Sequence, residues 1–147
     1  RKRQPPPDPV NSLLSLTSAF LTQRLVSGCH RCGLDCGTGF LHAFGYNRPG
    51  LALDLLEMLR CLVADHFVLK VLRRGVLARE HFVFAEGACR LTPAGFKEFT
   101  SAFDEDQNTI GKRQKSPATL MEMVLEATRQ GIDTGQIPDY ESLLPLR

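Results

Sequence analysis

The chain has 147 residues, of which 43% are apolar and 23% charged, an ordinary composition for a soluble domain with its own core. Eighteen Lys and Arg against 16 Asp and Glu give a formal net charge of only +2, which argues against a protein that simply coats a polyanion. No apolar run approaches the roughly 18 residues of a membrane helix, and the basic, Pro-rich start lacks the apolar stretch of a signal peptide. We therefore expect no membrane partner.

The five cysteines do not resemble the disulfide framework of a small secreted protein, because their number is odd and two of them fall in or beside apolar segments. This usage favours a reducing, cytoplasmic setting, with Cys61 and Cys89 as core thiols. Cys29, Cys32 and Cys36 are a candidate zinc cluster, since zinc prefers sulfur and nitrogen ligands. No second ligand pair follows them, which weakens that interpretation.

The first half of the chain predicts two helices separated by a glycine-rich loop. Residues 1–7 form an extended basic, Pro-rich linker. Asp8 is a suitable cap and Pro9 a suitable first residue for a helix over about 9–27 that ends at Gly28. A loop over 28–48 follows. A long apolar helix over about 49–74 then ends at Gly75, with room for a bend, and is expected to lie centrally.

The second half predicts a hairpin and two further helices. Residues 82–91 suit a hairpin that turns at Glu86-Gly87, and a helix begins at Thr92-Pro93. The polar stretch 104–115 predicts a mobile loop, and a last helix begins at Ser116-Pro117, with Gly131 beyond its end and an irregular tail over 132–147. The fold class is therefore mainly α: a helical bundle around a long central helix, with one small β-hairpin.

Candidate metal ligands lie around the start of the long helix. His42 closes the glycine-rich loop, and Asp54 and Glu57 are three apart in a Leu-rich helix. Burying such a pair is unfavourable unless each carboxylate finds a partner, and imidazole with carboxylate oxygens suits Mn²⁺ or Mg²⁺. The alternative is that the helix dipole alone favours acidic residues near a helix start, with Glu57 neighbouring Arg60.

Basic residues gather in three clusters, at 1–3, at 70–74 and at 112–115. A solvated face or a helix C-terminus explains each cluster singly. Together they are also able to neutralise phosphates, although no aromatic residues are interleaved for base stacking.

Several motifs resemble the CRISPR-associated integrase family, the metal-dependent nuclease-integrases numbered one among the CRISPR-associated proteins. In these motifs a His is followed by eleven residues and an Asp, and then by two residues and a Glu. The acids lie in a Leu-rich helix with an Arg before it and an Arg after it. The matching segments are DPVNSLLSL at 8–16, GLD at 33–35, GFLH at 39–42 and RPGLALDLLEMLR at 48–60, with a weaker match through EGACRLT at 86–92 and IPDYESLLPLR at the tail. The resemblance covers the helical C-terminal part of that family.

The resemblance implies a catalytic site and its partners. His42 matches the family's metal-binding histidine, Glu57 its second metal-site acid and Asp54 an accompanying acidic residue, with Mg²⁺ or Mn²⁺ as the ion. The implied reaction is strand transfer, in which a DNA 3′-hydroxyl attacks a phosphodiester of the CRISPR array. DNA, a second copy of the protein and the small companion protein of the adaptation complex are the implied partners. The expected phosphate contacts are Arg48, Arg60, Lys70, Arg73 and Arg74.

Three departures from the family pattern qualify these expectations. The family site includes a glutamate upstream of the stretch that matches residues 1–11, and we expect this glutamate to be missing from the chain. We expect the family's N-terminal β-rich domain, which also precedes this stretch, to be missing as well. Asn47-Arg48 and Gly50 stand where the pattern has Gly-Arg and Ser. We therefore expect this chain by itself to be weak or inactive as an enzyme. A catalytically incomplete module that binds DNA or a partner, and a zinc-stabilised helical domain, are the alternatives.

Overall fold

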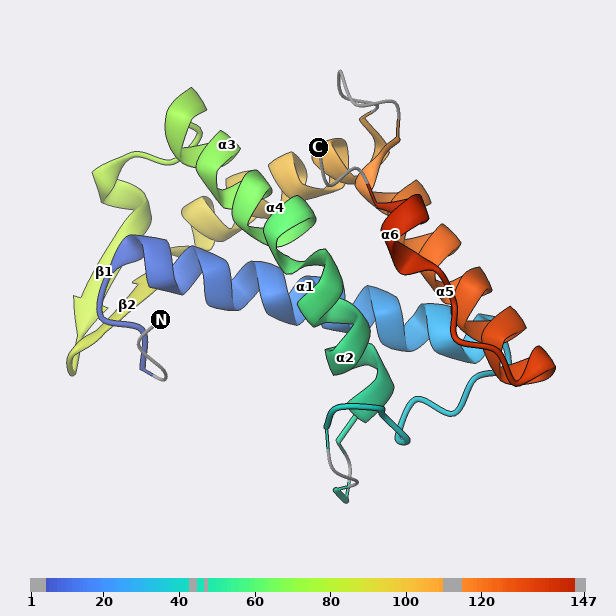
Figure 1. The fold of residues 1–147 in the computed structure, drawn as a ribbon. Helices are drawn as coiled ribbons and strands as arrows, with labels where there is room; N and C mark the ends of the chain where they lie inside the picture. The colour runs from blue at the N-terminus through green and yellow to red at the C-terminus, as the bar shows by residue number, and fades with distance from the viewer. Residues whose placement is uncertain (1–4, 43–44, 47, 110–114, 145–147) are drawn as a thin grey trace. The chain divides into compact units, whose positions relative to one another are not determined.

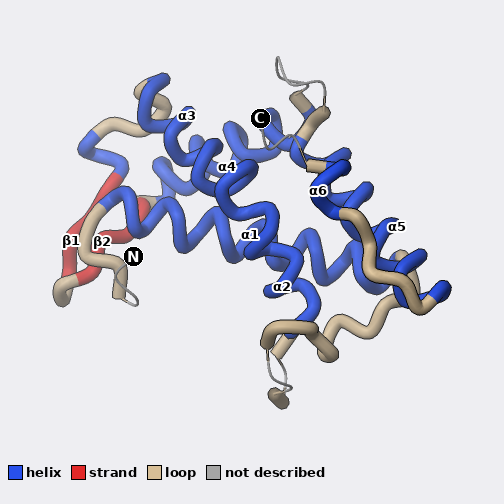
Figure 2. Tube along the Cα trace, viewed as in Figure 1, coloured by secondary structure: helices blue, strands red, loops and turns tan. Residues whose placement is uncertain are grey.

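A computed structural model describes residues 5–42, 45–46, 48–109 and 115–144. Helices dominate these residues, and the strands among them are confined to a single short hairpin, as Figure 2 shows. The predicted mainly α fold with one small hairpin is confirmed. Within the described ranges, no helix combines the length and the apolarity that crossing a bilayer would need.

The first helix, α1, spans Pro9–Arg31 and is drawn in blue in Figure 1. Its start is as predicted, because the Asp8 carboxylate accepts a hydrogen bond from the backbone N–H of Asn11 at 2.9 Å. The predicted end at Gly28 is wrong, since Gly28 lies inside the helix. The helix ends just before Gly33, whose φ of +70° is the left-handed conformation that terminates helices.

The predicted helix over 49–74 consists of three consecutive helical segments. They are α2 (Gly50–Leu59), the π-helix η1 (Arg60–Asp65) and α3 (His66–Arg74), which ends at Gly75 with φ +63°. A π-helix is wider than an α-helix, so it changes which side chains face inward. The prediction of a buried Cys61 assumed α-helical periodicity and is wrong, because this residue in η1 is exposed.

The hairpin forms as predicted. A 3₁₀ turn, η2 (Arg79–His81), leads into β1 (Phe82–Ala85), which pairs antiparallel with β2 (Ala88–Leu91). The turn residues Glu86 and Gly87 both have positive φ, the pattern of a tight two-residue hairpin turn. Cys89 is buried as predicted, and its N–H donates to the Pro6 carbonyl at 2.7 Å. The described part of the predicted linker, 5–7, is therefore non-helical and hydrogen-bonded to β2, while residues 1–4 lie outside the described ranges.

Helix α4 spans Pro93–Asn108, so the predicted loop over 104–115 is wrong for 104–108. The charged residues there lie on a helix whose inner face is anchored by buried Phe103, Asp106 and Gln107. Composition alone pointed to a loop because it does not reveal this buried stripe. Residues 110–114 lie outside the described ranges.

The last long helix, α5 (Pro117–Thr134), begins as predicted, with Ser116 accepting a hydrogen bond from the Thr119 N–H at 3.2 Å. Gly131 lies inside this helix rather than beyond it, and the helix ends before Gly135, whose φ is +69°. The tail is not wholly irregular, since α6 (Tyr140–Leu143) forms a short helix capped by Asp139.

The chain divides into two compact units, and α1 contributes residues to both. The first comprises residues 1–20 and 60–107 and holds a cluster of aromatic rings. Phe103 lies with its centroid 5.3 Å from those of Phe20 and Phe67, and Phe67 lies 5.4 Å from Phe99. The second unit comprises residues 21–59 and 108–147, and its buried side chains include Leu25, Leu55 and Val124. That 8–147 acts as one catalytic domain stays a prediction.

Candidate functional site around His42

The glycine-rich loop between α1 and α2 is ordered by side-chain hydrogen bonds from aspartate. The Asp35 carboxylate accepts from the Gly37 N–H at 2.9 Å and from the Thr38 hydroxyl at 2.7 Å. These bonds close a tight turn of the type that Asp favours. The N–H of Leu51, in the first turn of α2, donates to the Cys36 carbonyl at 3.0 Å and ties this turn to the helix.

The loop passes directly over the start of α2, and glycines allow this close approach. A Cβ atom on Gly39 would lie 2.6 Å from Oδ2 of Asp54 and 2.7 Å from the carbonyl carbon of Gly50. A Cβ on Gly50 would lie 2.9 Å from the Gly37 carbonyl oxygen. Side chains at these positions would push the loop off the helix, so the glycines set the distance between His42 and Asp54.

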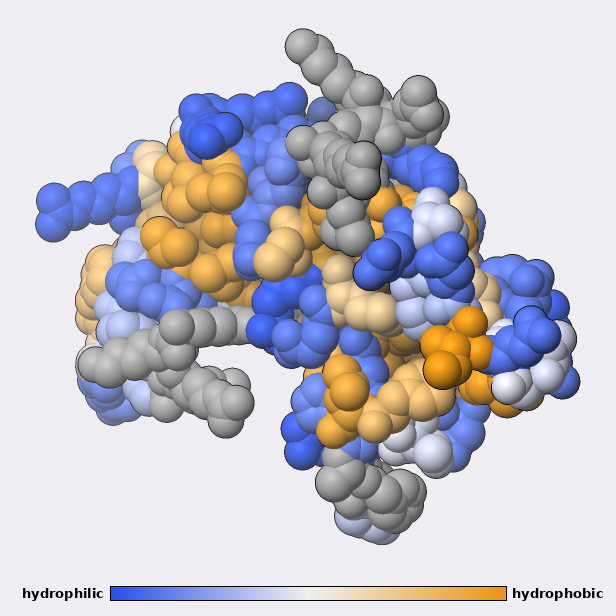
Figure 3. Space-filling model, viewed as in Figure 1, coloured by the Kyte–Doolittle hydropathy of each residue, from blue (hydrophilic) through white to orange (hydrophobic). Residues whose placement is uncertain are grey.

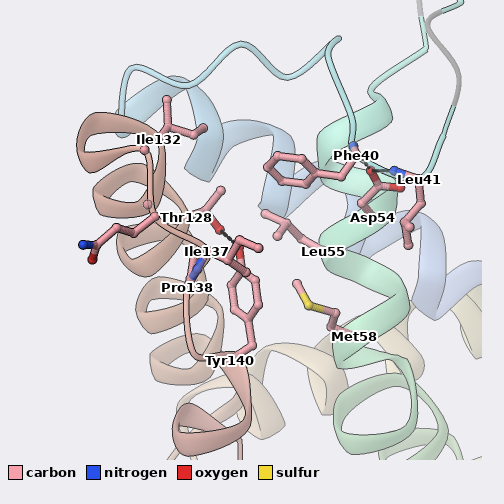
Figure 4. A pocket seen from close by; sticks show the side chains of 13 residues that line it. Phe40, Leu41, Asp54, Leu55, Met58, Thr128, Ile132, Ile137, Pro138 and Tyr140 are labelled. Atoms are coloured by element: carbon pink, nitrogen blue, oxygen red, sulfur yellow. Dashed lines mark hydrogen bonds between the residues drawn. The ribbon is translucent and has the colours of Figure 1, made fainter.

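Asp54 lies beneath the loop, and its carboxylate accepts hydrogen bonds from the loop backbone. Its side chain is buried, with the residue only 3% exposed. Oδ2 accepts the N–H groups of Phe40 and Leu41, the latter at 2.8 Å, and Oδ1 accepts the N–H of His42 at 3.1 Å. Figure 4 shows the bonds to Phe40 and Leu41. Three successive N–H groups that converge on one anion form a backbone nest.

Asp54 also binds the imidazole of His42. Nδ1 of His42 hydrogen-bonds to Oδ1 of the carboxylate, and 26% of the histidine side chain is exposed to solvent. Burial raises the pKa of Asp54, but the hydrogen bonds from Leu41, His42 and Phe40 outweigh it, so the pKa lies below its ordinary value. The carboxylate is therefore ionised at neutral pH and acts only as an acceptor.

The structure brings the side chains of His42 and Asp54 into contact. Glu57 differs from Asp54 in its exposure to solvent. Glu57 is exposed on α2, whereas Asp54 is buried. Among the described residues, no group of three or more His, Cys, Asp or Glu is arranged to hold a metal ion. The donor types still suit Mn²⁺ or Mg²⁺, and the Nδ1 bond to Asp54 leaves Nε2 of His42 as the nitrogen that a cation would use.

The predicted phosphate contacts differ in how available they are. Arg48, Arg73 and Arg74 are exposed, while Arg60 is half-buried. Lys70 forms an ion pair with the buried carboxylate of Asp106. The charge of Lys70 is thus already compensated inside the first unit.

The cysteine cluster at the end of α1 is not arranged as a zinc site in the described residues. The thiols of Cys29 and Cys36 are hydrogen-bonded to each other, and burial followed by this neighbour raises the pKa of Cys29 to about 12. A zinc ligand must be a thiolate, and a high pKa disfavours it in the metal-free site. Because no three-ligand group occurs in the described ranges, the zinc interpretation is not supported.

An apolar pocket of about 540 Å³ lies beside the loop, within the second unit. Phe40 and Leu41 form one side of it and Ile132, Ile137 and other C-terminal residues form the opposite side, as Figure 4 shows. These four apolar side chains are all more than half exposed, and apolar surface is visible between the loop and the C-terminal segment in Figure 3. Sequence reasoning missed this pocket because its walls come from distant segments; the unexplained apolar pair Phe40-Leu41 beside His42 was the available signal.

The Tyr140 hydroxyl holds one wall of the pocket in place. It is hydrogen-bonded to the hydroxyl of Thr128 on α5 at 2.9 Å, and Thr128 in turn donates to the Val124 carbonyl at 2.7 Å. This link fixes the C-terminal segment against α5 (Figure 4).

The matching family agrees with the motifs around this site. The family model of "CRISPR associated protein Cas1" matches residues 1–105, which include His42, Asp54 and Glu57. The chain belongs to the Cas1 family. The resemblance seen in the sequence is thereby confirmed.

Cas1 relatives align with nearly the whole chain. The chain is 37% identical to a Cas4/Cas1 fusion of Rhodospirillum rubrum, and the match covers 99% of this chain and 26% of that protein. It is 35% identical to a Cas1 endonuclease of Thermus thermophilus, and this match covers 96% of this chain and 44% of that protein. The chain therefore spans less than half the length of these relatives.

Solved structures share its fold. A Cas1 protein from Thermotoga maritima superposes with a TM-score of 0.83 at 24% identity, covering 92% of this chain and 43% of that one. A casposase bound to its integration product gives 0.81 at 22% identity, covering 95% and 42%.

Proposed function

We propose that this Cas1 chain is the helical part of a metal-dependent DNA endonuclease and integrase that inserts spacer DNA into a CRISPR array in the prokaryotic cytoplasm. The observation that carries the proposal is the contact between His42 and Asp54, within the region that the Cas1 family model matches. The curated relatives are named CRISPR-associated endonucleases, and the casposase structure is described as bound to an integration product.

His42, Asp54 and Glu57 make up the proposed site. Mg²⁺ or Mn²⁺ is the proposed cofactor, held by Nε2 of His42 and by the exposed carboxylate of Glu57. When bound, the cation supplies Lewis-acid stabilisation of phosphate charge. Because the described residues provide no three-ligand group, at least one further oxygen ligand from outside them belongs to the proposal.

The residues of this chain have two tasks in the proposed reaction. A 3′-hydroxyl oxygen forms a bond to phosphorus, the bond from phosphorus to the 3′-oxygen of the target strand breaks, and the proton of the nucleophile is balanced by one gained by the leaving oxygen. His42 is held in one orientation through Nδ1, and the exposed guanidinium groups of Arg48, Arg73 and Arg74 hold phosphates of the DNA. Lys70 and Arg60 contribute less, because one is ion-paired and the other half-buried.

DNA, a second copy of the protein and a small companion protein are the proposed partners. Two of the structural neighbours are described as complexes that contain Cas1 and Cas2, which makes Cas2 the candidate companion. A catalytically incomplete module that binds DNA or a partner remains the second candidate, because only part of a ligand set lies in the described residues.

Activity on branched DNA tests the proposal. The protein is assayed in the longest form that its gene encodes, with Mn²⁺, on a branched substrate that reports both cleavage and joining. We expect His42→Ala and Glu57→Ala to abolish both reactions, while Glu141→Ala, an exposed acid in α6, retains them. Full activity in the first two variants would refute the assignment, and DNA binding without any activity in the wild type would favour the binding module.

A further inference from the structure

We infer that Asp54 is a positioning residue that selects the Nδ1–H form of the His42 imidazole and presents its Nε2, and that it does not itself ligate a cation. The inference rests on the proposed function for its purpose, but its geometry is independent of that function. It assigns different tasks to the two acids that the sequence places three residues apart.

The lone pairs of Asp54 are already occupied. An ionised carboxylate has about four acceptor sites on its two oxygens. Oδ2 accepts the N–H groups of Phe40 and Leu41, and Oδ1 accepts the N–H and the Nδ1–H of His42. A cation bound to Asp54 would have to displace at least one of these donors.

The space around the carboxylate is also closed. The residue is 3% exposed, and the Gly39 backbone lies so near that even a Cβ atom there would be 2.6 Å from Oδ2. Glu57, three residues later, is exposed to solvent. Access therefore favours Glu57, and not Asp54, as the acid that reaches a cation.

The imidazole is fixed by the same contact. Because an ionised carboxylate only accepts, the His42 nitrogen that faces it must carry the hydrogen. In a neutral imidazole the hydrogen on Nδ1 leaves the lone pair on Nε2, the side that is not covered by Asp54. Histidines that bind metals are commonly held in this way by a carboxylate on the other nitrogen.

The tautomer of His42 in metal-free protein is the direct test. Long-range ¹H–¹⁵N spectra of the ¹⁵N-labelled protein, recorded at about pH 8 where an ordinary histidine is neutral, distinguish a protonated Nδ1 from a protonated Nε2. We expect the Nδ1–H form alone in the wild type. A dominant Nε2–H form would overturn the inference without involving metal, DNA or activity.

Two variants separate positioning from general loop order. Asp54→Asn is expected to give a mixture of both tautomers. Asp35→Asn is the matched control, because it weakens the same loop through Gly37 and Thr38 without touching His42, and it is expected to keep the Nδ1–H form. If Asp54→Asn fails to fold, the wild-type spectrum still decides the matter; if it folds and keeps the single tautomer, Asp54 does not select it.

Amide exchange tests whether Asp54 ligates. On addition of Mg²⁺, the N–H groups of Phe40, Leu41 and His42 are expected to keep their protection from hydrogen exchange, because their acceptor is not withdrawn. Loss of protection at these three amides alone would show that the cation takes the carboxylate and would refute the second half of the inference. The absence of metal-dependent DNA cleavage, by contrast, would count against the proposed function and leave the tautomer result intact.

Discussion

Gly39 is the residue at which the loop comes closest to α2. Its hydrogen points at the Asp54 carboxylate, where a methyl group would meet Oδ2 at 2.6 Å and the Gly50 backbone at 2.7 Å. Neither contact is with a flexible side-chain end that moves freely, because Asp54 is held by four hydrogen bonds. The position of His42 therefore depends on a residue that has no side chain.

Gly39→Ala is expected to lower the free energy of unfolding by about 1–3 kcal/mol, as overpacking usually does. The measurement is thermal unfolding followed by circular dichroism. Gly45→Ala is the control, since among the described residues its Cβ would come nearest to Arg48, at an ordinary 3.5 Å, and should change stability little. Equal midpoints for both variants would mean that the loop does not press on α2 as described.

The aromatic cluster joins α3 and α4 within the first unit. Phe99 is fully buried and lies 5.4 Å from Phe67, whereas Phe96, one turn earlier on α4, is 45% exposed. Edge-to-face ring pairs add to the stabilisation that burial provides. The two residues on one helix thus form a natural comparison.

Phe99→Ala is expected to cost about 3–5 kcal/mol of stability, because it removes a fully buried ring and leaves a cavity. Phe96→Ala should cost much less, since the residue is already 45% exposed and its ring packs edge-on against Phe20 at the margin of the cluster. Chemical denaturation with urea measures both values. A loss for Phe96→Ala as large as that for Phe99→Ala would contradict the packing described for α4.

Helix α5 carries an ion-pair network that predicts a pH dependence. Arg129 holds both carboxylate oxygens of Glu126, at 2.6 and 3.1 Å, and Gln130 donates to the same group. Hydrogen bonds from Arg129, then from Gln130, lower the pKa of Glu126 from 4.5 to about 2. Because the folded-state pKa is the lower one, this contribution to stability is complete above about pH 4.5 and disappears as the pH falls towards 2.

The pKa of Glu126 is measured from the carboxyl carbon shift in an NMR titration. Arg129→Met removes the main cause, so we expect the midpoint to move up towards its ordinary value. An unchanged midpoint in this variant would show that the bidentate contact is not kept in solution.

We expect that folding of the described residues does not require a bound metal. Most of the buried side chains in the described residues are apolar, and the thiols of Cys29 and Cys36 interact with each other. We expect a strong chelator to leave the thermal midpoint unchanged and metal analysis to find no stoichiometric zinc. A chelator-induced loss of helicity would restore the zinc-stabilised alternative. By the proposed function, the same chelator should abolish DNA cleavage.

Lys70 differs from the neighbouring basic residues because it has an ion-pair partner that is distant in the sequence. Lys70, Arg73 and Arg74 look equivalent along the chain, yet Lys70 is paired with Asp106, 36 residues away. The same holds for Asp54, whose partners lie 12 to 14 residues earlier in a loop. Neither contact can be predicted from the residues that neighbour Lys70 or Asp54 in the sequence.

The sequence by itself determined the helical class, the hairpin turn at Glu86-Gly87 and the helix starts at Pro9 and Pro117, because caps, turns and apolar periodicity act over a few neighbouring residues. It also pointed to His42 and Asp54. Only the tertiary structure decided which of two nearby glycines ends each of α1 and α5, that Cys61 is exposed, and that Asp54 is buried while Glu57 is not. Those outcomes depend on packing between segments far apart in the chain, and burial, unlike a cap or a turn, has no signature within a few residues.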